Sequence, residues 1–136
     1  MSGLKDISVK VVSEFAAANA QAILREVETL LERLLETGEA GVIDLRGLPM
    51  APADFEMLME ELGEGEVAAT IEAGGPSSVR ETSYSGVWWI THRDDGGAIV
   101  AEFIEVARVP EILKSQPEDM RRARERLAAR LAQRAS

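Results

Sequence analysis

The stretch from Leu62 to Pro110 constrains the fold more than any other part of the chain. It contains seven of the eleven glycines, and these glycines help to separate four short runs that can form strands. The first run alternates apolar and polar residues, which is typical of an antiparallel strand with one buried face. An Asp-Gly pair between the last two runs is a strong hairpin signal. The stretch therefore predicts an antiparallel meander, with strands over 66–73, 78–83, 87–92 and 99–106.

Helical patterns flank this meander on both sides. From Glu14 to Thr37, apolar residues recur three or four positions apart, and Gly38 follows as a typical helix end. Pro52 suits the first position of a second, short helix that Gly63 ends. A last helix over Pro117–Arg134 has only a narrow apolar stripe. The predicted inner faces are Ile23, Val27, Leu30, Leu31, Leu34 and Leu35 in the first helix, Phe55, Leu58, Met59 and Leu62 in the second, and Met120, Leu127 and Leu131 in the last.

Two further segments have strand-like patterns. Ile7, Val9 and Val11 alternate with polar or charged residues near the start of the chain, as in an edge strand, and Gly41–Leu45 predicts another short strand. The order of elements indicates the α+β class: a four-stranded antiparallel meander at about 66–106, with the long N-terminal helix, the short second helix and the C-terminal helix packed on it. A length of 136 residues suits a single domain spanning 1–136.

Charge argues against two classes of partner. The net charge is −9, which disfavours general binding to nucleic acid or to an anionic membrane surface. Residues 114–136 carry seven basic and three acidic side chains, a net +4, so the rest carries −13. An acidic body with a basic tail indicates intramolecular docking or self-association.

No run of apolar residues approaches a membrane span and no signal peptide is visible, so we expect a cytoplasmic protein.

The residues able to perform catalysis are few. There is no cysteine, which excludes thiolate metal sites and cysteine nucleophiles. His92 is the only histidine, and it can act as a base only if partners gather around it. Glu81, Glu102 and Glu105 lie on neighbouring predicted strands. They can act as paired carboxylates in glycoside hydrolysis or in binding a hard cation, or they can simply belong to the solvent-exposed face of the sheet. A small enzyme using His92 with Glu81 or Glu105 stays an alternative, and we expect neither metal nor cofactor.

Trp88 and Trp89 are adjacent on the most apolar predicted strand. Neighbouring strand residues point to opposite faces, so one indole should enter the core. The other should face outward or lie under a helix. An outward indole would be a binding surface, because tryptophan is enriched at binding hot spots. The alternative is that the first helix covers one ring and the last helix covers the other.

Five short motifs in this stretch resemble a known family. Leu62-Gly-Glu-Gly-Glu-Val67, Glu81-Thr82, Gly86-Val-Trp-Trp-Ile90, Ile104-Glu-Val106 and Val109-Pro110 follow in order. The series resembles the C-terminal conserved region of the HupH/HyaF hydrogenase expression and formation proteins. The resemblance covers about fifty residues, more than a third of the chain. The chain differs from typical members by being short, and by having Ser85 where proline is common before the glycine.

The resemblance implies a maturation accessory factor of a [NiFe] hydrogenase that binds a client without catalysis, as a chaperone does. The implied partners are the hydrogenase small-subunit precursor or other maturation factors. The residues that we expect to contact a partner are Glu81, Thr82, Gly86, Trp88, Trp89 and Glu105. A structural module that forms a homodimer, through the last helix or the edge of the sheet, stays a third possibility.

Overall fold

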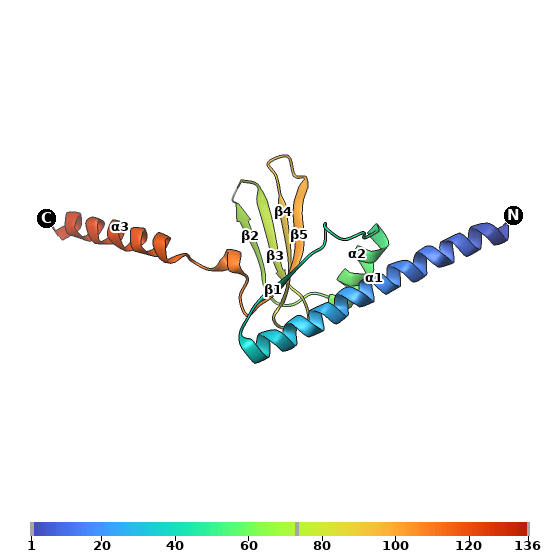
Figure 1. Cartoon of the computed structure of the whole chain (residues 1–136). Coiled ribbons are helices and arrows are strands. Elements are labelled where there is room, and N and C mark those ends of the chain that lie inside the picture. The colour runs from blue at the N-terminus through green and yellow to red at the C-terminus, as the bar shows by residue number, and fades with distance from the viewer. Residues whose placement is uncertain (1, 73, 136) are drawn as a thin grey trace.

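An antiparallel five-stranded sheet lies at the centre of the fold, with two helices against one face (Figure 1). The computed structural model describes residues 2–72 and 74–135, with side chains from Asn19 onward. The elements in chain order are α1 (Ser2–Thr37), β1 (Gly41–Asp44), α2 (Pro52–Leu62), β2 (Ala68–Glu72), β3 (Pro76–Glu81), β4 (Val87–Arg93), β5 (Ile99–Val106), the 3₁₀ helix η1 (Glu111–Leu113) and α3 (Pro117–Ala135). The predicted α+β class is confirmed.

The sheet has the order β1-β5-β4-β3-β2, so the predicted meander forms and gains a fifth strand. The added strand is the predicted Gly41–Leu45 segment, which pairs antiparallel with β5 and places Ile43 opposite Ile104. Both side chains lie in the core beneath the helices, and Leu45 follows them inward. Burial of these apolar groups accounts for the position of β1, which the local pattern could not assign.

Helices α1 and α2 cover one face of the sheet. Ile23 and Val27 of α1 and Leu58 and Leu62 of α2 pack against the inner residues of β1, β4 and β5. The predicted helical stripe is thus largely confirmed, because its spacing keeps one side of α1 on the sheet. Leu35 is an exception: it is 86 % exposed, since it lies in the last turn.

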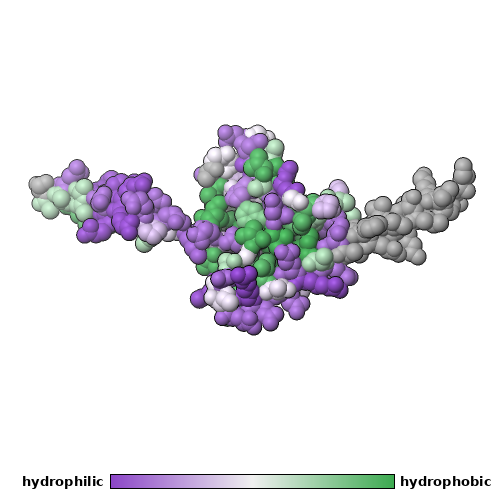
Figure 2. Space-filling model, viewed as in Figure 1, coloured by the Kyte–Doolittle hydropathy of each residue, from purple (hydrophilic) through white to green (hydrophobic). Residues whose placement is uncertain are grey.

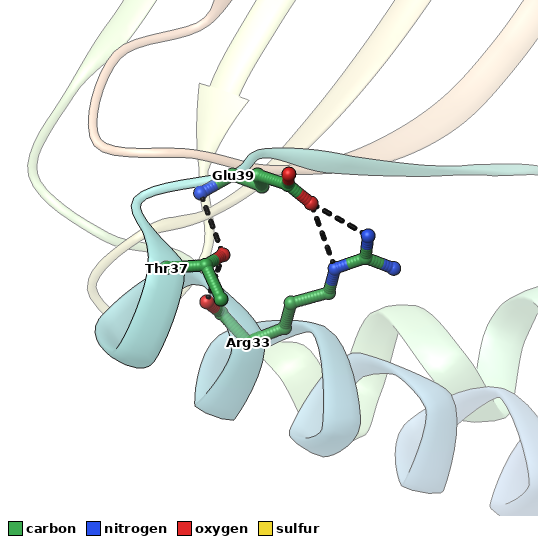
Figure 3. A network of polar contacts seen from close by, with 3 residues as sticks. All are labelled: Arg33, Thr37 and Glu39. Carbon is green, nitrogen blue, oxygen red and sulfur yellow. Dashed lines mark hydrogen bonds and ion pairs between the residues drawn. The ribbon is translucent and has the colours of Figure 1, made fainter.

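The end of α1 is fixed by a small polar network (Figure 3). The Nε and Nη2 atoms of Arg33 donate to Glu39 Oε2 at 3.0 and 2.6 Å, and the Glu39 backbone N–H donates to Thr37 Oγ1. Thr37 Oγ1 donates to the Arg33 carbonyl, and Gly38 adopts a φ of +78° as the chain leaves the helix. These exposed contacts fix the direction in which the chain turns into β1, and each contributes little to stability.

Two predictions about the ends of the chain are wrong. Residues 7–11 belong to α1, which begins at Ser2 and not at Glu14. A brief alternation is overridden there by the alanine-rich segment after it, because alanine is the strongest helix former. Helix α3 does not pack on the sheet: among the described residues it buries none, and it extends away from the body (Figure 1). Its stripe is too narrow and its surface too hydrophilic (Figure 2) to require burial in its own chain.

No helix within the described part of the chain is long and apolar enough to cross a membrane. This holds for α1 and also for α3, in which charged residues recur at every turn.

The core beneath α2 gives a direct test of the packing. Leu58 is fully buried and Met57, its neighbour on the same helix, is 38 % exposed. We expect Leu58→Ala to lower the free energy of unfolding by about 2–5 kcal/mol, because it leaves a cavity. The matched change Met57→Ala should alter it by no more than about 0.5 kcal/mol. Urea unfolding followed by circular dichroism measures both, and equal effects would contradict this placement of α2.

Candidate functional site

Both tryptophans are buried, on opposite faces of the sheet. Trp89 is 7 % exposed and lies in the core under α1 and α2, and its Nε1 donates to Glu102 Oε2 at 3.0 Å. Trp88 is 6 % exposed and packs with Val79 and Ile90 on the other face. Its Nε1 donates to the Ala107 carbonyl at 3.0 Å. Neither ring therefore faces outward. Trp88 is covered by the segment that follows β5, and not by α3 as one alternative had it.

Glu105 is one of the residues that hold this covering segment in place. It is 6 % exposed, and its Oε2 accepts a hydrogen bond at 2.9 Å from the Glu111 backbone N–H at the start of η1. Leu113 of η1 then packs on the cluster that contains Trp88. The carboxylate that we expected at a partner surface thus fastens the chain over the second face of the sheet.

Thr82 and Gly86 shape the turn between β3 and β4. Thr82 is buried, and its Oγ1 donates to the Val87 carbonyl at 2.9 Å and accepts from the Tyr84 backbone N–H at 3.2 Å. Gly86 has a φ of +90°, which residues other than glycine rarely adopt, and its carbonyl accepts from the Ala107 N–H. These two residues fix the turn that leads into the tryptophan pair.

The acidic and imidazole groups considered for catalysis do not meet. Glu81 and Glu105 flank Trp88 in the register, and His92 lies four residues further along β4, about 13 Å away at the usual rise per residue. The His92 Nδ1 atom is 2.7 Å from Ser77 Oγ, and its ring lies against Phe103. Glu102 lies on the helix-covered face, where it accepts from Trp89. Among the side chains that the structure describes, from Asn19 to Ala135 without Ala73, no group of three His, Asp or Glu could hold a metal ion.

A shallow hollow lies where the chain leaves α2. Its volume is about 90 Å³, and it is lined by Met59, Leu62, Gly63, Glu64, Arg80, Glu81, Thr82 and Trp89. The segment from Leu62 to Val67 crosses this end of the sheet: Ser83 donates through N and Oγ to the Leu62 carbonyl, and Gly65 N–H donates to the Glu81 carbonyl at 2.8 Å. Glu64 forms an ion pair with Arg80 at the rim. Three of the motifs that carry the family resemblance therefore meet around this hollow.

The two glycines of this segment are needed because the chain passes so close to β3. A Cβ atom on Gly65 would overlap the Thr82 carbonyl oxygen, and one on Gly63 would press on the Ser83 side chain. Gly63 also has a φ of +65°. The glycine motif thus has a structural role, and Met59, Glu64 and Glu81 are the side chains that it leaves accessible.

A second, larger groove lies beside this hollow, between α1 and α2. Its volume is about 280 Å³, and its lining is mostly apolar: Leu24, Val27, Leu31, Leu62 and Tyr84, with Glu28 and Glu61 as its charged members. Tyr84 is 51 % exposed. Sequence reasoning missed this groove, because it treated the leucines of α1 as core and gave Tyr84 no role.

An antiparallel sheet with two helices on one face makes this an α+β protein. Comparison with known proteins then shows its family. Residues 17–133 match the C-terminal conserved region of the HupH hydrogenase expression protein family. The chain belongs to this family, as the resemblance of its motifs predicted.

Named relatives agree with this assignment. The chain is 39 % identical over 90 residues to the hydrogenase expression/formation protein HoxQ of Azotobacter vinelandii, which covers 62 % of this chain and 32 % of HoxQ. It is 28 % identical over 109 residues to HoxQ of Cupriavidus necator, covering 80 % and 39 %. It thus spans about a third of the length of these curated relatives. The solved structure of the hydrogenase expression protein HupH from Thiobacillus denitrificans is 50 % identical, with a TM-score of 0.82, covering 85 % of this chain and 96 % of that one.

The close approach at Gly65 predicts a specific cost for a side chain there. We expect Gly65→Ala to lower the free energy of unfolding by about 1–3 kcal/mol, because the added Cβ forces the backbone away from Thr82. Gly96→Ala is the matched control, since the nearest atom to its Cβ is 3.4 Å away and the change should cost less than about 0.5 kcal/mol. Thermal unfolding of both variants measures the difference. A Gly65→Ala protein as stable as the control would show that the segment does not lie this close to β3.

Proposed function

We propose that this domain is an accessory factor in the expression and maturation of a [NiFe] hydrogenase, and that it holds a client polypeptide without catalysing a reaction. The names of its relatives, which are hydrogenase expression or expression/formation proteins, support a role in this process. The observation that carries the proposal is the meeting of three family motifs around one surface hollow, beside the exposed side chain of Met59.

The surface around the hollow suits a polypeptide partner better than a small molecule. The hollow is too small for a typical ligand, since ligand pockets usually exceed about 300 Å³. Around it, Met59 offers a flexible apolar side chain, which adapts to different partners. Glu64, Arg80 and Glu81 supply charges that can select the register of a bound segment. Of the residues predicted to bind a partner, Trp89 and Thr82 form the buried floor of the hollow and Glu81 lies at its rim, whereas Gly86, Trp88 and Glu105 do not line it.

The proposed client is the precursor of the hydrogenase small subunit, with another maturation factor as the second possibility. The binding takes place in the cytoplasm and needs no cofactor. A cysteine-free chain has no thiolate with which to bind an iron–sulfur cluster, so it would act on the polypeptide. The alternative of a small enzyme has less support, because His92 is bonded to Ser77 and distant from Glu81 and Glu105.

Met59 and Met57 allow a matched test. Both are exposed on α2, at 46 % and 38 %, but only Met59 lines the hollow. We expect Met59→Asp to weaken binding to the purified small-subunit precursor by about tenfold or more, because a charge replaces an apolar contact. Met57→Asp should bind like the unmodified protein. Biolayer interferometry with immobilised precursor measures both affinities.

Two results would count against the proposal in different ways. If neither the precursor nor another maturation factor binds the unmodified protein, the client role is wrong. If the precursor binds and both methionine variants bind equally well, the client role stands and its placement at the hollow is wrong.

A further inference from the structure

Helix α3 presents an apolar stripe that its own chain leaves uncovered. Met120, Leu127 and Leu131 are 57–61 % exposed, and at helical spacing they lie on one side of α3. A helix of this length gains most of its stability from packing an amphipathic face, so the exposed stripe is suited to a partner. Arg124 and Arg130 flank the stripe on either side, by the 100° turn per residue.

The groove between α1 and α2 has the complementary character. Its apolar lining includes Leu24, Leu31 and Tyr84, and Glu28 and Glu61 are its charged side chains. Leu24 and Leu31 are seven residues apart, about 10 Å along a helix, which is also the spacing of Met120 and Leu127. An apolar stripe between arginines thus fits an apolar groove with carboxylates at its edge. The same contrast holds for the whole chain, in which a basic C-terminal segment of +4 accompanies a body of −13.

We propose that α3 of one copy of this chain docks in the α1–α2 groove of a second copy, and that the second copy returns the contact. The dimer is then a reciprocal exchange with two-fold symmetry, in which both grooves and both stripes are buried. This proposal concerns the α1–α2 groove and not the hollow beside Met59 to which we assign the client (the client hollow), and it does not depend on the client role.

The position of α3 favours the groove of a second copy over its own. Leu113, just before α3, packs on the Trp88 cluster, on the face of the sheet opposite the helices. Only residues 114–116 separate η1 from α3, and three extended residues span about 10 Å at most. Helix α3 then runs outward from the body (Figure 1). Its own groove lies between α1 and α2, on the other face of the sheet, whereas a second molecule can approach the helix that extends from the body.

Because the chain has no cysteine, a disulfide can identify the occupant of the groove. The test uses the full chain with Tyr84→Cys and Leu127→Cys together, under mild oxidation, with Tyr84→Cys and Ala129→Cys as control. Ala129 is on the opposite side of α3, about 160° from Leu127. We expect covalent dimers in the first protein far in excess of the control, on non-reducing gels. A cross-linked monomer would show that α3 folds back on its own groove. That result, or a yield equal to the control, overturns the proposal.

Light scattering after size-exclusion chromatography tests the dimer without cysteines. We expect the unmodified chain to dimerise, more weakly as salt is raised, because screening weakens the Arg–Glu pairs. Leu127→Asp should raise the dimer dissociation constant by about tenfold or more, and Ala129→Asp should leave it unchanged. Both positions are exposed, so we expect both variants to stay folded, and circular dichroism checks this. A chain that is monomeric at every concentration, or a dimer that Leu127→Asp does not weaken, overturns the proposal.

Discussion

Strand β4 and its two tryptophans hold the two faces of the molecule together. Trp89 fills the core beneath α1 and α2, and Trp88 fills the smaller core under η1. Burying an indole side chain contributes roughly 4–6 kcal/mol by its area, as an upper estimate. Each ring also satisfies its N–H, one at Glu102 and one at the Ala107 carbonyl. The second bond matters for the architecture, because it draws the chain after β5 across the open face of the sheet and closes what would otherwise be an exposed apolar surface.

The sequence predicted the elements whose signals are local. The spacing of leucines in α1, the glycine turns of the meander and the position of Pro52 depend on neighbouring residues only. The pairing of β1 with β5 was not predictable in this way, because it joins residues about sixty positions apart through burial of Ile43 and Leu45. The fate of α3 was misjudged for a related reason. A narrow apolar stripe shows that a helix has a packing side, but it does not show whether that side meets its own chain or another molecule.

The candidate site shows the same limit at the level of single residues. Thr82, Trp88, Trp89 and Glu105 were expected at a partner surface, and all four are buried with their polar groups satisfied. A motif-based signal cannot separate residues that build a surface from residues that present it. Met59 was assigned to the inner face of α2, although it lies at the rim of the hollow. Its exposure depends on how far α2 tilts over the sheet, which no helical periodicity specifies.

Leu62 connects the two surfaces that we assign to partners. It lines the client hollow on one side and the α1–α2 groove on the other, and it is almost completely buried between them. Such a residue is a fixed wall, held by α2 and by the hydrogen bonds of its carbonyl to Ser83. Coupling between two sites requires an element with two arrangements that both partners bias. Because Leu62 is buried and held by these contacts, we expect it to keep one arrangement, so that a client and a second copy of the chain influence each other only by direct contact or by repulsion between their own charges.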